Sequence, residues 1–348
     1  MHRVLLTLVI VTAGAFGLPA ADRAAQTEKS KKLKEPKPKD PKSVAPKYGV
    51  KTPGVQIPMS ALKLEAELAV EGSPGTLLFT DRIMVSNGND ILRIDPKTNK
   101  FTEPFKGFDQ PCGGLVSAFD SIWVPNCGNQ TLRRLEPKTG KVTATIDVAI
   151  ANLPSVIAAS PDSIWLLSDE RTTLSRIDPT ANSVVAEIRV EAGCNSLVFA
   201  ESALWLTCPA LNKVIRIDPR TNLAVKRIDV ANKPVSLAFG EGSIWVLCQT
   251  GGKVARIDPK TDKVTVTIEL SIPNAEGNIA FGEASVWVST PGFPLSRIHP
   301  GTDKVVQQFT AAGGGTVQGG LKSIWLVDRL AGKILRFDPK RIAATITD

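Results

Sequence analysis

The sequence contains very little histidine. Its 348 residues include two, His2 and His299. Histidine is the side chain most often used as a general base near neutral pH and a frequent metal ligand, so most histidine-based catalysis and metal binding are excluded. The apolar residues also show no long helical periodicity, so an α-helical fold is not expected.

Little net positive charge lies outside the N-terminal region. The formal net charge is +8, but residues 28–54 hold nine Lys against Glu28, Glu35 and Asp40, and the residues before them add one more positive charge. The rest of the chain is therefore nearly neutral. Net charge gives no reason to expect DNA or RNA as a partner.

The N-terminus has the layout of a secretory signal peptide. Arg3 precedes an uncharged apolar run at residues 4–17, and small residues follow up to Ala21. The run is short for a membrane span, and no Cys follows it as a lipid attachment site. We expect a signal peptide at residues 1–21 and an exported protein, periplasmic or extracellular. An uncleaved anchor is the alternative.

Residues 22–54 are expected to form a disordered linker. Within residues 28–54, five Pro accompany the nine Lys, which leaves few apolar side chains to bury. Such a segment is extended and partly polyproline II. Either it is a solvated spacer, or its lysines contact an anionic surface such as lipid or cell wall.

A repeat of about forty residues covers the rest of the chain. Trp recurs at 123, 165, 205, 245, 287 and 325, and Met84 takes its place in the first copy. An Arg–X–Asp–Pro motif keeps the same period, as at Arg93 to Pro96, with Glu136 and His299 replacing Asp in two copies. Pro and the Asn, Gly or Asp that follows it are typical of a tight turn.

Each copy is interpreted as four short antiparallel strands. Around Trp245 we expect strands at 235–239, 243–248, 253–257 and 264–270. This period and strand number are those of propeller blades. The prediction is an all-β fold, a seven-bladed β-propeller of four-stranded antiparallel blades, over residues 55–348. Residues 62–70 or 342–347 must complete the last blade. We place the C-terminal segment there and the N-terminal one on its outer edge.

These motifs resemble the YVTN-type β-propeller repeats and, more distantly, the streptogramin (virginiamycin B) lyase propellers. The resemblance to the lyases implies His and Glu on one face that hold Mg²⁺ and transfer protons. This sequence departs from that pattern. The third residue after each Trp is neither His nor Glu, and His299 falls in a turn at the opposite end of its blade; the residues found there are Asn126, Ser168, Cys208, Cys248, Thr290 and Asp328.

The cysteines fall at matching places in two copies. Cys112 and Cys127 flank the second copy's first hairpin, and Cys194 and Cys208 flank that of the fourth. Opposed positions of a hairpin suit a disulfide, and an exported chain is oxidised. We predict both disulfides rather than a thiolate metal site. Cys248 is left as a free thiol, because Pro234 stands where its partner would be.

The loops at the cysteine-bearing end vary most between copies, and variable polar loops on a rigid scaffold commonly bind ligands. The candidate binding residues are Asn87, Asn126, Asp169, Asn195, Gln249, Glu276, Asn278, Asp328 and Arg329. No catalytic residue, metal ligand or cofactor is predicted.

The favoured function is an exported, non-catalytic, monomeric propeller that binds a protein, peptide, glycan or small ligand on this face. The alternative is a Mg²⁺- or Ca²⁺-dependent lyase or lactone hydrolase. Its ion would be held by oxygen and amide groups of Asn87, Asn126, Glu276, Asn278 and Asp328.

Overall fold

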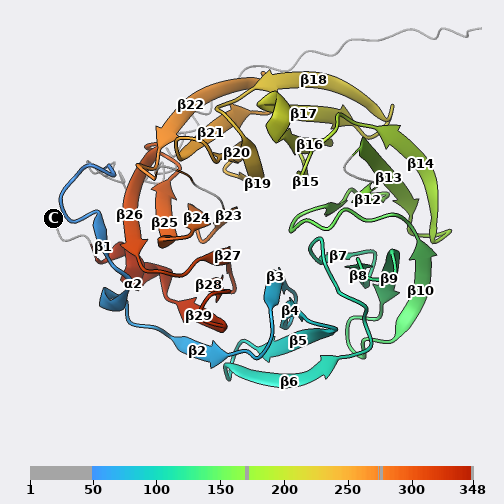
Figure 1. Ribbon diagram of the computed structural model, residues 1–348, viewed down its shortest axis with the longest axis horizontal. Coiled ribbons are helices and arrows are strands. Elements are labelled where there is room, and N and C mark those ends of the chain that lie inside the picture. Colours follow the sequence, from blue (N-terminus) through green and yellow to red (C-terminus); the bar gives the residue numbers. More distant parts are fainter. Residues whose placement is uncertain (1–48, 169–171, 273, 275–276, 346–348) are drawn as a thin grey trace, which may run out of the picture. The chain divides into compact units, whose positions relative to one another are not determined.

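The computed structural model describes residues 49–168, 172–272, 274 and 277–345. They form seven sheets arranged as blades around a centre, and consecutive strands within each blade are antiparallel (Figure 1). The predicted seven-bladed β-propeller is confirmed. The predicted signal peptide and most of the linker lie outside the described residues.

The first strand of each blade lies nearest the centre, and the fourth lies on the rim (Figure 1). Blades 1 to 3 comprise β3 (Pro74–Phe79), β4 (Ile83–Asn87), β5 (Asp90–Asp95), β6 (Lys100–Phe105); β7 (Val116–Ala118), β8 (Ser121–Asn126), β9 (Thr131–Leu135), β10 (Val142–Asp147); and β11 (Ile157–Ala159), β12 (Ile164–Ser168), β13 (Thr173–Asp178), β14 (Ser183–Arg189). Blades 4 and 5 comprise β15 (Ser196–Ala200), β16 (Ala203–Cys208), β17 (Lys213–Asp218), β18 (Leu223–Asp229); and β19 (Pro234–Gly240), β20 (Ser243–Cys248), β21 (Lys253–Asp258), β22 (Lys263–Glu269).

Blades 6 and 7 also take strands from the N-terminal part of the chain. They comprise β23 (Asn278–Gly282), β24 (Ser285–Thr290), β25 (Phe293–His299), β26 (Lys304–Thr310) with β1 (Gln56–Pro58); and β27 (Gly315–Gly320), β28 (Ser323–Asp328), β29 (Lys333–Phe337) with β2 (Ala66–Ala69). The short helices are η1 (Met59–Ala61), η2 (Pro209–Leu211) and α2 (Pro339–Ala343).

The expectation that residues 342–347 complete the last blade is wrong. The fourth strand of blade 7 is β2, which pairs antiparallel with β29. Residues 62–70, expected on the outer edge of that blade, thus contain its fourth strand, and β1, which was not predicted, pairs in parallel with β26 of blade 6. The N-terminal part of the chain therefore connects blades 6 and 7, and its residues Val55 and Leu62 are buried.

The turn chemistry explains this outcome. In six copies the fourth residue after the start of the third turn has a left-handed φ between 51° and 73°; these residues are Asn99, Gly140, Asn182, Asn222, Asp262 and Asp303. The seventh copy has Ile342 there, and its branched Cβ disfavours that conformation. Asp338 accepts a hydrogen bond from the backbone N–H of Lys340, but Asp95, Asp178, Asp218 and Asp258 make the same contact in the turns of other copies. The missing left-handed residue therefore distinguishes the seventh copy, where the chain continues as α2.

The repeated Trp forms the core between blades. All six Trp are fully buried, and each stands opposite the repeated Arg of the third strand, as Trp165 does opposite Arg176. Each packs against the following blade, as Trp325 does against Leu77 and Ile83 of blade 1. The guanidinium carbon of Arg176 lies 5.1 Å from the Trp165 ring centroid, within cation–π range.

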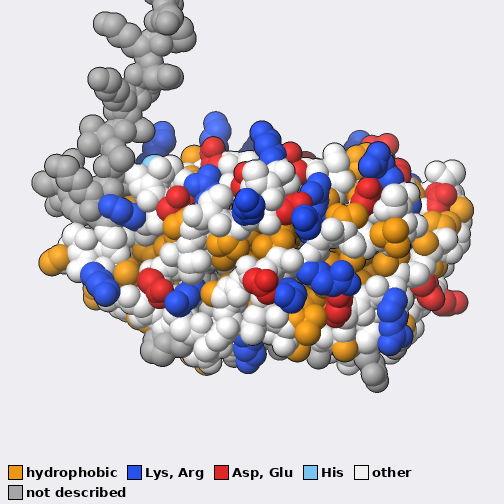
Figure 2. Space-filling model, turned by 90° about the horizontal axis from the view of Figure 1, so that it is seen from above, with side chains coloured by type: hydrophobic (Ala, Val, Ile, Leu, Met, Phe, Trp, Pro, Cys, Tyr) orange, Lys and Arg blue, Asp and Glu red, His pale blue; other side chains and the backbone are white. Residues whose placement is uncertain are grey.

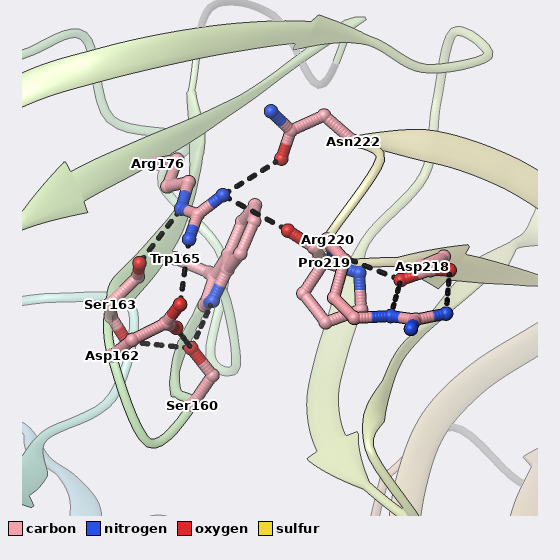
Figure 3. A network of polar contacts seen from close by, with 9 residues as sticks. All are labelled: Ser160, Asp162, Ser163, Trp165, Arg176, Asp218, Pro219, Arg220 and Asn222. Atoms are coloured by element: carbon pink, nitrogen blue, oxygen red, sulfur yellow. Dashed lines mark hydrogen bonds and ion pairs between the residues drawn. The ribbon is translucent and has the colours of Figure 1, made fainter. Parts of the chain in front are cut away.

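The repeated Arg also connects neighbouring blades (Figure 3). Arg176 donates from Nη1 to the carbonyl oxygen of Pro219 (2.9 Å) and to Oδ1 of Asn222 (3.3 Å), both in the turn of blade 4. Within its own blade it donates to Ser163 and pairs with Asp162, each at 2.8 Å. Such donors are strong because the guanidinium is charged. We call this interblade contact an arginine latch.

Five blades each donate an arginine latch to the turn of the next blade. Besides Arg176, they are made by Arg134, Arg216, Arg256 and Arg336. The latch from Arg336 to Pro96 and Asn99 joins blade 7 to blade 1 and so closes the ring. The hydrogen bonds that the described residues show for Arg93 and Arg297 remain within their own blades.

The rim carries both signs of charge. Figure 2 shows Lys and Arg side chains interspersed with Asp and Glu, with apolar side chains between them. Exposed apolar residues of the rim strands include Val142, Val185, Leu223 and Val225. Among the described residues, no helix has the length and apolar character needed to cross a membrane.

Candidate functional site

The first strands surround a cavity of about 670 Å³ at the centre of the ring. Its wall is built from the first strands or their entry segments in all seven blades, including Thr76, Leu115, Asn195, Leu237 and Val317. Several lining residues are glycines, so no side chain extends from these positions into the cavity; these are Gly113, Gly114, Gly277, Gly314 and Gly315. We call this space the channel. Its size is typical of a site for a small organic ligand.

Both predicted disulfides are present. Cys112 is bonded to Cys127, and Cys194 to Cys208. Each joins the segment before a first strand to the end of the second strand, where blades 2 and 4 meet the channel. A disulfide restricts the unfolded chain and fixes such a loop in place. The two bonds therefore stiffen the end of the ring at which the second strands finish, which we call the channel mouth.

Cys248 is a free, buried thiol, and it stands opposite Pro234 in the register of β19 and β20. Burial raises its pKa to about 12. The thiol is therefore protonated at neutral pH. A reactive cysteine needs a lowered pKa, so Cys248 is a packing residue here.

Four of the predicted residues line the channel: Asn195, Gln249, Asn278 and Arg329. Asn278 accepts a hydrogen bond at Oδ1 from the backbone N–H of Val317 in blade 7 (3.1 Å). Asn195 accepts one at Oδ1 from the Thr207 hydroxyl (2.6 Å). These two amides are thus partly committed to holding the wall.

Three other predicted residues support loops and do not line the channel. Asn126 is fully buried, accepting from the backbone N–H of Asp109 and facing the carbonyls of its own hairpin. Asn87 donates to the carbonyl oxygen of Glu71. Asp328 is buried and accepts from the N–H of Ala331. Their position at the strand ends was predicted, but their side chains serve the loops.

Asp169 and Glu276 lie outside the described residues. The prediction that they contribute to this face stays a prediction.

The sequence reasoning missed the small hydroxyl side chains of the wall. Thr76, Ser155, Ser236 and Thr316 all line the channel. Ser236 accepts from the backbone N–H of Ile279 in blade 6 (3.3 Å). A signal for three wall residues was present in the sequence, since Ser236, Asn278 and Thr316 each stand nine residues before the Trp of their copy.

The channel wall carries one charged side chain among its described residues, that of Arg329. Burial lowers the pKa of its guanidinium from the usual value, and its nearest polar contact is the Thr316 hydroxyl at 3.4 Å. An arginine remains charged in proteins, so the mouth holds one positive charge.

His299 lies far from this chemistry. It ends β25 and begins the turn that receives the latch from Arg256. Burial, together with the charge of Arg297, lowers its pKa. Among the described residues, no group of three His, Cys, Asp or Glu side chains is placed to hold a metal ion.

Solved structures with a similar fold include streptogramin B lyases and BamB. A streptogramin B lyase has 18% identity and a TM-score of 0.66, over 78% of this chain and 96% of that one. A catalytically inactive virginiamycin B lyase from Staphylococcus aureus with quinupristin has 18% identity and a TM-score of 0.67, over 79% and 98%. BamB from Moraxella catarrhalis has 10% identity and a TM-score of 0.57, over 77% and 84%.

At these identities the likeness shows the propeller fold alone. No protein-family model matches the chain, and no curated protein matches it.

Proposed function

We propose that this protein is an exported binding protein that holds a small organic molecule or a short peptide segment in its channel without chemical turnover. The observation that carries the proposal is the channel of about 670 Å³, walled by all seven blades and stiffened by two disulfides at its mouth. A rigid wall favours binding, because little conformational entropy is lost when the ligand enters.

The polar groups of the wall suit recognition. Asn195, Ser155 and Gln249 present amide and hydroxyl groups among apolar residues such as Leu237 and Phe281. This mixture of apolar surface with a few placed polar groups is common in ligand sites. The six Trp are fully buried, so none can stack against a sugar ring in the channel. A small organic molecule or peptide therefore fits better than a glycan.

The described groups around the channel do not supply an acid–base pair. General acid–base catalysis needs a side chain that exchanges a proton near neutral pH. Arg329 stays protonated. Cys248, with a pKa of about 12, is protonated as well, and His299 lies in a turn of the opposite end. Binding without turnover is the function that these residues support.

Export is part of the proposal. Two disulfides are typical of oxidising compartments, and the sequence begins with the pattern of a signal peptide. We assign the repeats to the YVTN type on their Arg–X–Asp–Pro and Trp spacing. The Lys-rich linker then follows the cleaved signal, where it is free to contact an anionic envelope surface.

The test is to fill the channel. Ser155 lines it and is half-buried, so Ser155→Trp places an indole in the space with little change to the fold. Val185→Trp adds the same group on the exposed rim as a control. The probes are pools of N-acetyl tripeptides and small organic acids, amines and amides, with retention measured by ultrafiltration and mass spectrometry.

The wild-type protein and Val185→Trp are expected to retain the same pool members, and Ser155→Trp to lose them. Equal retention by all three proteins, or no retention by the wild type, would refute channel binding. Circular dichroism of each variant confirms that its fold is intact.

The Mg²⁺- or Ca²⁺-dependent lyase or lactone hydrolase remains the alternative, supported by a fold shared with streptogramin lyases. Of its named ligands, Asn126 and Asp328 are committed to loop backbone. Thermal melts with EDTA and then with each ion test it. A bound ion at about 100 times its dissociation constant stabilises by about 2.7 kcal/mol, and a saturable shift would favour the enzyme.

A further inference from the structure

The sevenfold repeat allows one position of the channel mouth to be compared between blades. The residue four places after the Trp, or after Met84 in blade 1, follows the second strand. At the six positions that the structure describes it is Gly88, Cys127, Pro209, Gln249, Pro291 or Arg329, while Asp169 of blade 3 lies outside the described residues. Glycine, proline and disulfide-bonded cysteine serve the loop itself. Gln249 and Arg329 alone of these six bring hydrogen-bonding side chains, and both line the channel.

Arg329 differs from the arginines of the latches. Arg176, for comparison, makes its hydrogen bonds to Ser163, Asp162 and the next blade at 2.8 to 3.3 Å. Arg329 has one long contact, 3.4 Å from Nη2 to the Thr316 hydroxyl, and no salt bridge joins it to a described carboxylate. Its planar donor fork is therefore available at the mouth of the channel.

Gln249 supplies the second observation. Its exposed fraction is 6%, and its backbone N–H donates to the carbonyl oxygen of Lys233. Its side-chain amide has no hydrogen bond to any described residue, although it borders the channel. The oxygen and nitrogen of this amide are not among the buried polar atoms that lack a partner, so they are open to the channel. A molecule in the channel can therefore form hydrogen bonds with this amide without displacing a protein partner.

We propose that the channel binds the carboxylate of its ligand through Arg329, while the side-chain amide of Gln249 bonds a neighbouring polar group of the same ligand. A guanidinium fork matches a carboxylate in shape and charge. The described wall offers a single cation among neutral groups, which suits one negative charge better than a doubly charged phosphate. The inference rests on the proposed function. Two sources share this chemistry, a free peptide C-terminus and a small monocarboxylic acid.

The experiment uses the full chain without its signal and three pools. The first holds N-acetyl tripeptides with free carboxylates, the second holds the same tripeptides as C-terminal amides, and the third holds lactate, benzoate and hexanoate. Retention by the wild type is compared with that by Arg329→Gln, Arg329→Lys and Gln249→Leu. Arg220→Gln is the matched control, because Arg220 is an exposed arginine in the turn that begins at Asp218.

We expect the wild type to retain carboxylates and not the matched amides. Arg329→Gln should weaken retention at least about tenfold, as for loss of a charge-assisted hydrogen bond. Arg329→Lys, which keeps the charge without the fork, should give an intermediate loss. Gln249→Leu should weaken it about fivefold, and Arg220→Gln should leave it unchanged. Retention of the first pool identifies a peptide C-terminus, and retention of the third a small acid.

Amides retained as well as acids, or carboxylates retained equally by Arg329→Gln, would overturn the carboxylate site. In that case, loss of retention in Ser155→Trp would show that the channel still binds ligands. If the wild type retains no member of any pool, both the carboxylate site and channel binding fall. Arg329 makes a single long contact, so its replacement should cost the fold little stability. Thermal melts of the variants confirm that they fold.

Discussion

The arginine latch predicts a specific loss of stability when it is removed. In Arg176→Met the aliphatic stem over Trp165 is kept, but the donors to Pro219 and Asn222 in the next blade are lost. A hydrogen bond from a charged group contributes about 1.5–3 kcal/mol. The cation–π contact at 5.1 Å adds about 1 kcal/mol. Together the expected loss is about 3 kcal/mol.

At about 2 cal/mol/K per residue, a loss of this size lowers the Tm of a ring of about 290 residues by about 5 °C. Differential scanning calorimetry measures it. The matched control is Arg93→Met in blade 1, because Arg93 contacts Glu103 of its own blade at 3.4 Å and its Nε is buried without a partner. Removing that orphaned donor offsets the lost hydrogen bond, but Arg93 also loses a cation–π contact, since its guanidinium carbon lies 4.4 Å from the Phe105 ring centroid. Arg93→Met should therefore cost about 1 kcal/mol, and the difference between the two variants isolates the polar contacts of Arg176.

Equal Tm losses in the two variants would refute the reasoning. The interblade hydrogen bonds would then contribute nothing beyond the packing that any third-strand arginine provides. A loss in Arg176→Met that Asn222→Ala reproduces only in small part would assign most of the effect to the Pro219 carbonyl, the shorter of the two bonds.

Three further predictions concern the cysteines and the histidine. Replacing Cys112 and Cys127 by Ser opens a loop of 15 residues and should lower stability by about 3 kcal/mol, seen as a fall in Tm; an unchanged Tm would contradict it. Cys248, with a pKa of about 12, should not react with Ellman's reagent until guanidinium chloride unfolds the chain, and labelling of the native protein would contradict its burial. His299 has a lowered pKa, so the unfolded chain binds its proton more readily, and stability should fall as the pH drops below the ordinary value of 6.5. His299→Gln should flatten this part of the Tm–pH curve, and an identical curve in that variant would refute the assignment.

The fold was predictable because one physical unit is repeated. A Trp that must be buried and a turn that needs Pro and a left-handed residue recur together, so each copy supports the others. The closure was predicted wrongly because residues 62–70 and 342–347 share the same apolar alternation. The deciding signal was a single residue, Ile342, whose branched Cβ disfavours the left-handed position that Asn99 and Asp303 occupy in their turns.

The candidate site was predictable in outline. Gln249 and Arg329 were predicted from their place at the end of the second strand, and both line the channel. The same reasoning also selected Asn126 and Asp328, whose side chains bond to the loop backbone. Sequence spacing places a residue at a strand end and does not say whether its side chain turns to the channel or to the loop. That choice depends on which backbone groups lack partners, and these are set by the neighbouring blade.

The pairing of β2 with β29 has a consequence for the timing of assembly. About 260 residues separate Ala69 from Lys333, its last partner in that pair. At about 5–20 residues per second, the ribosome needs about 13–50 s to add them. One of the first strands to be synthesised therefore waits for the last strand of the described chain. A chain that is interrupted anywhere before β29 keeps an unpaired strand at its beginning, and the ring is completed only after almost all of the chain has been made.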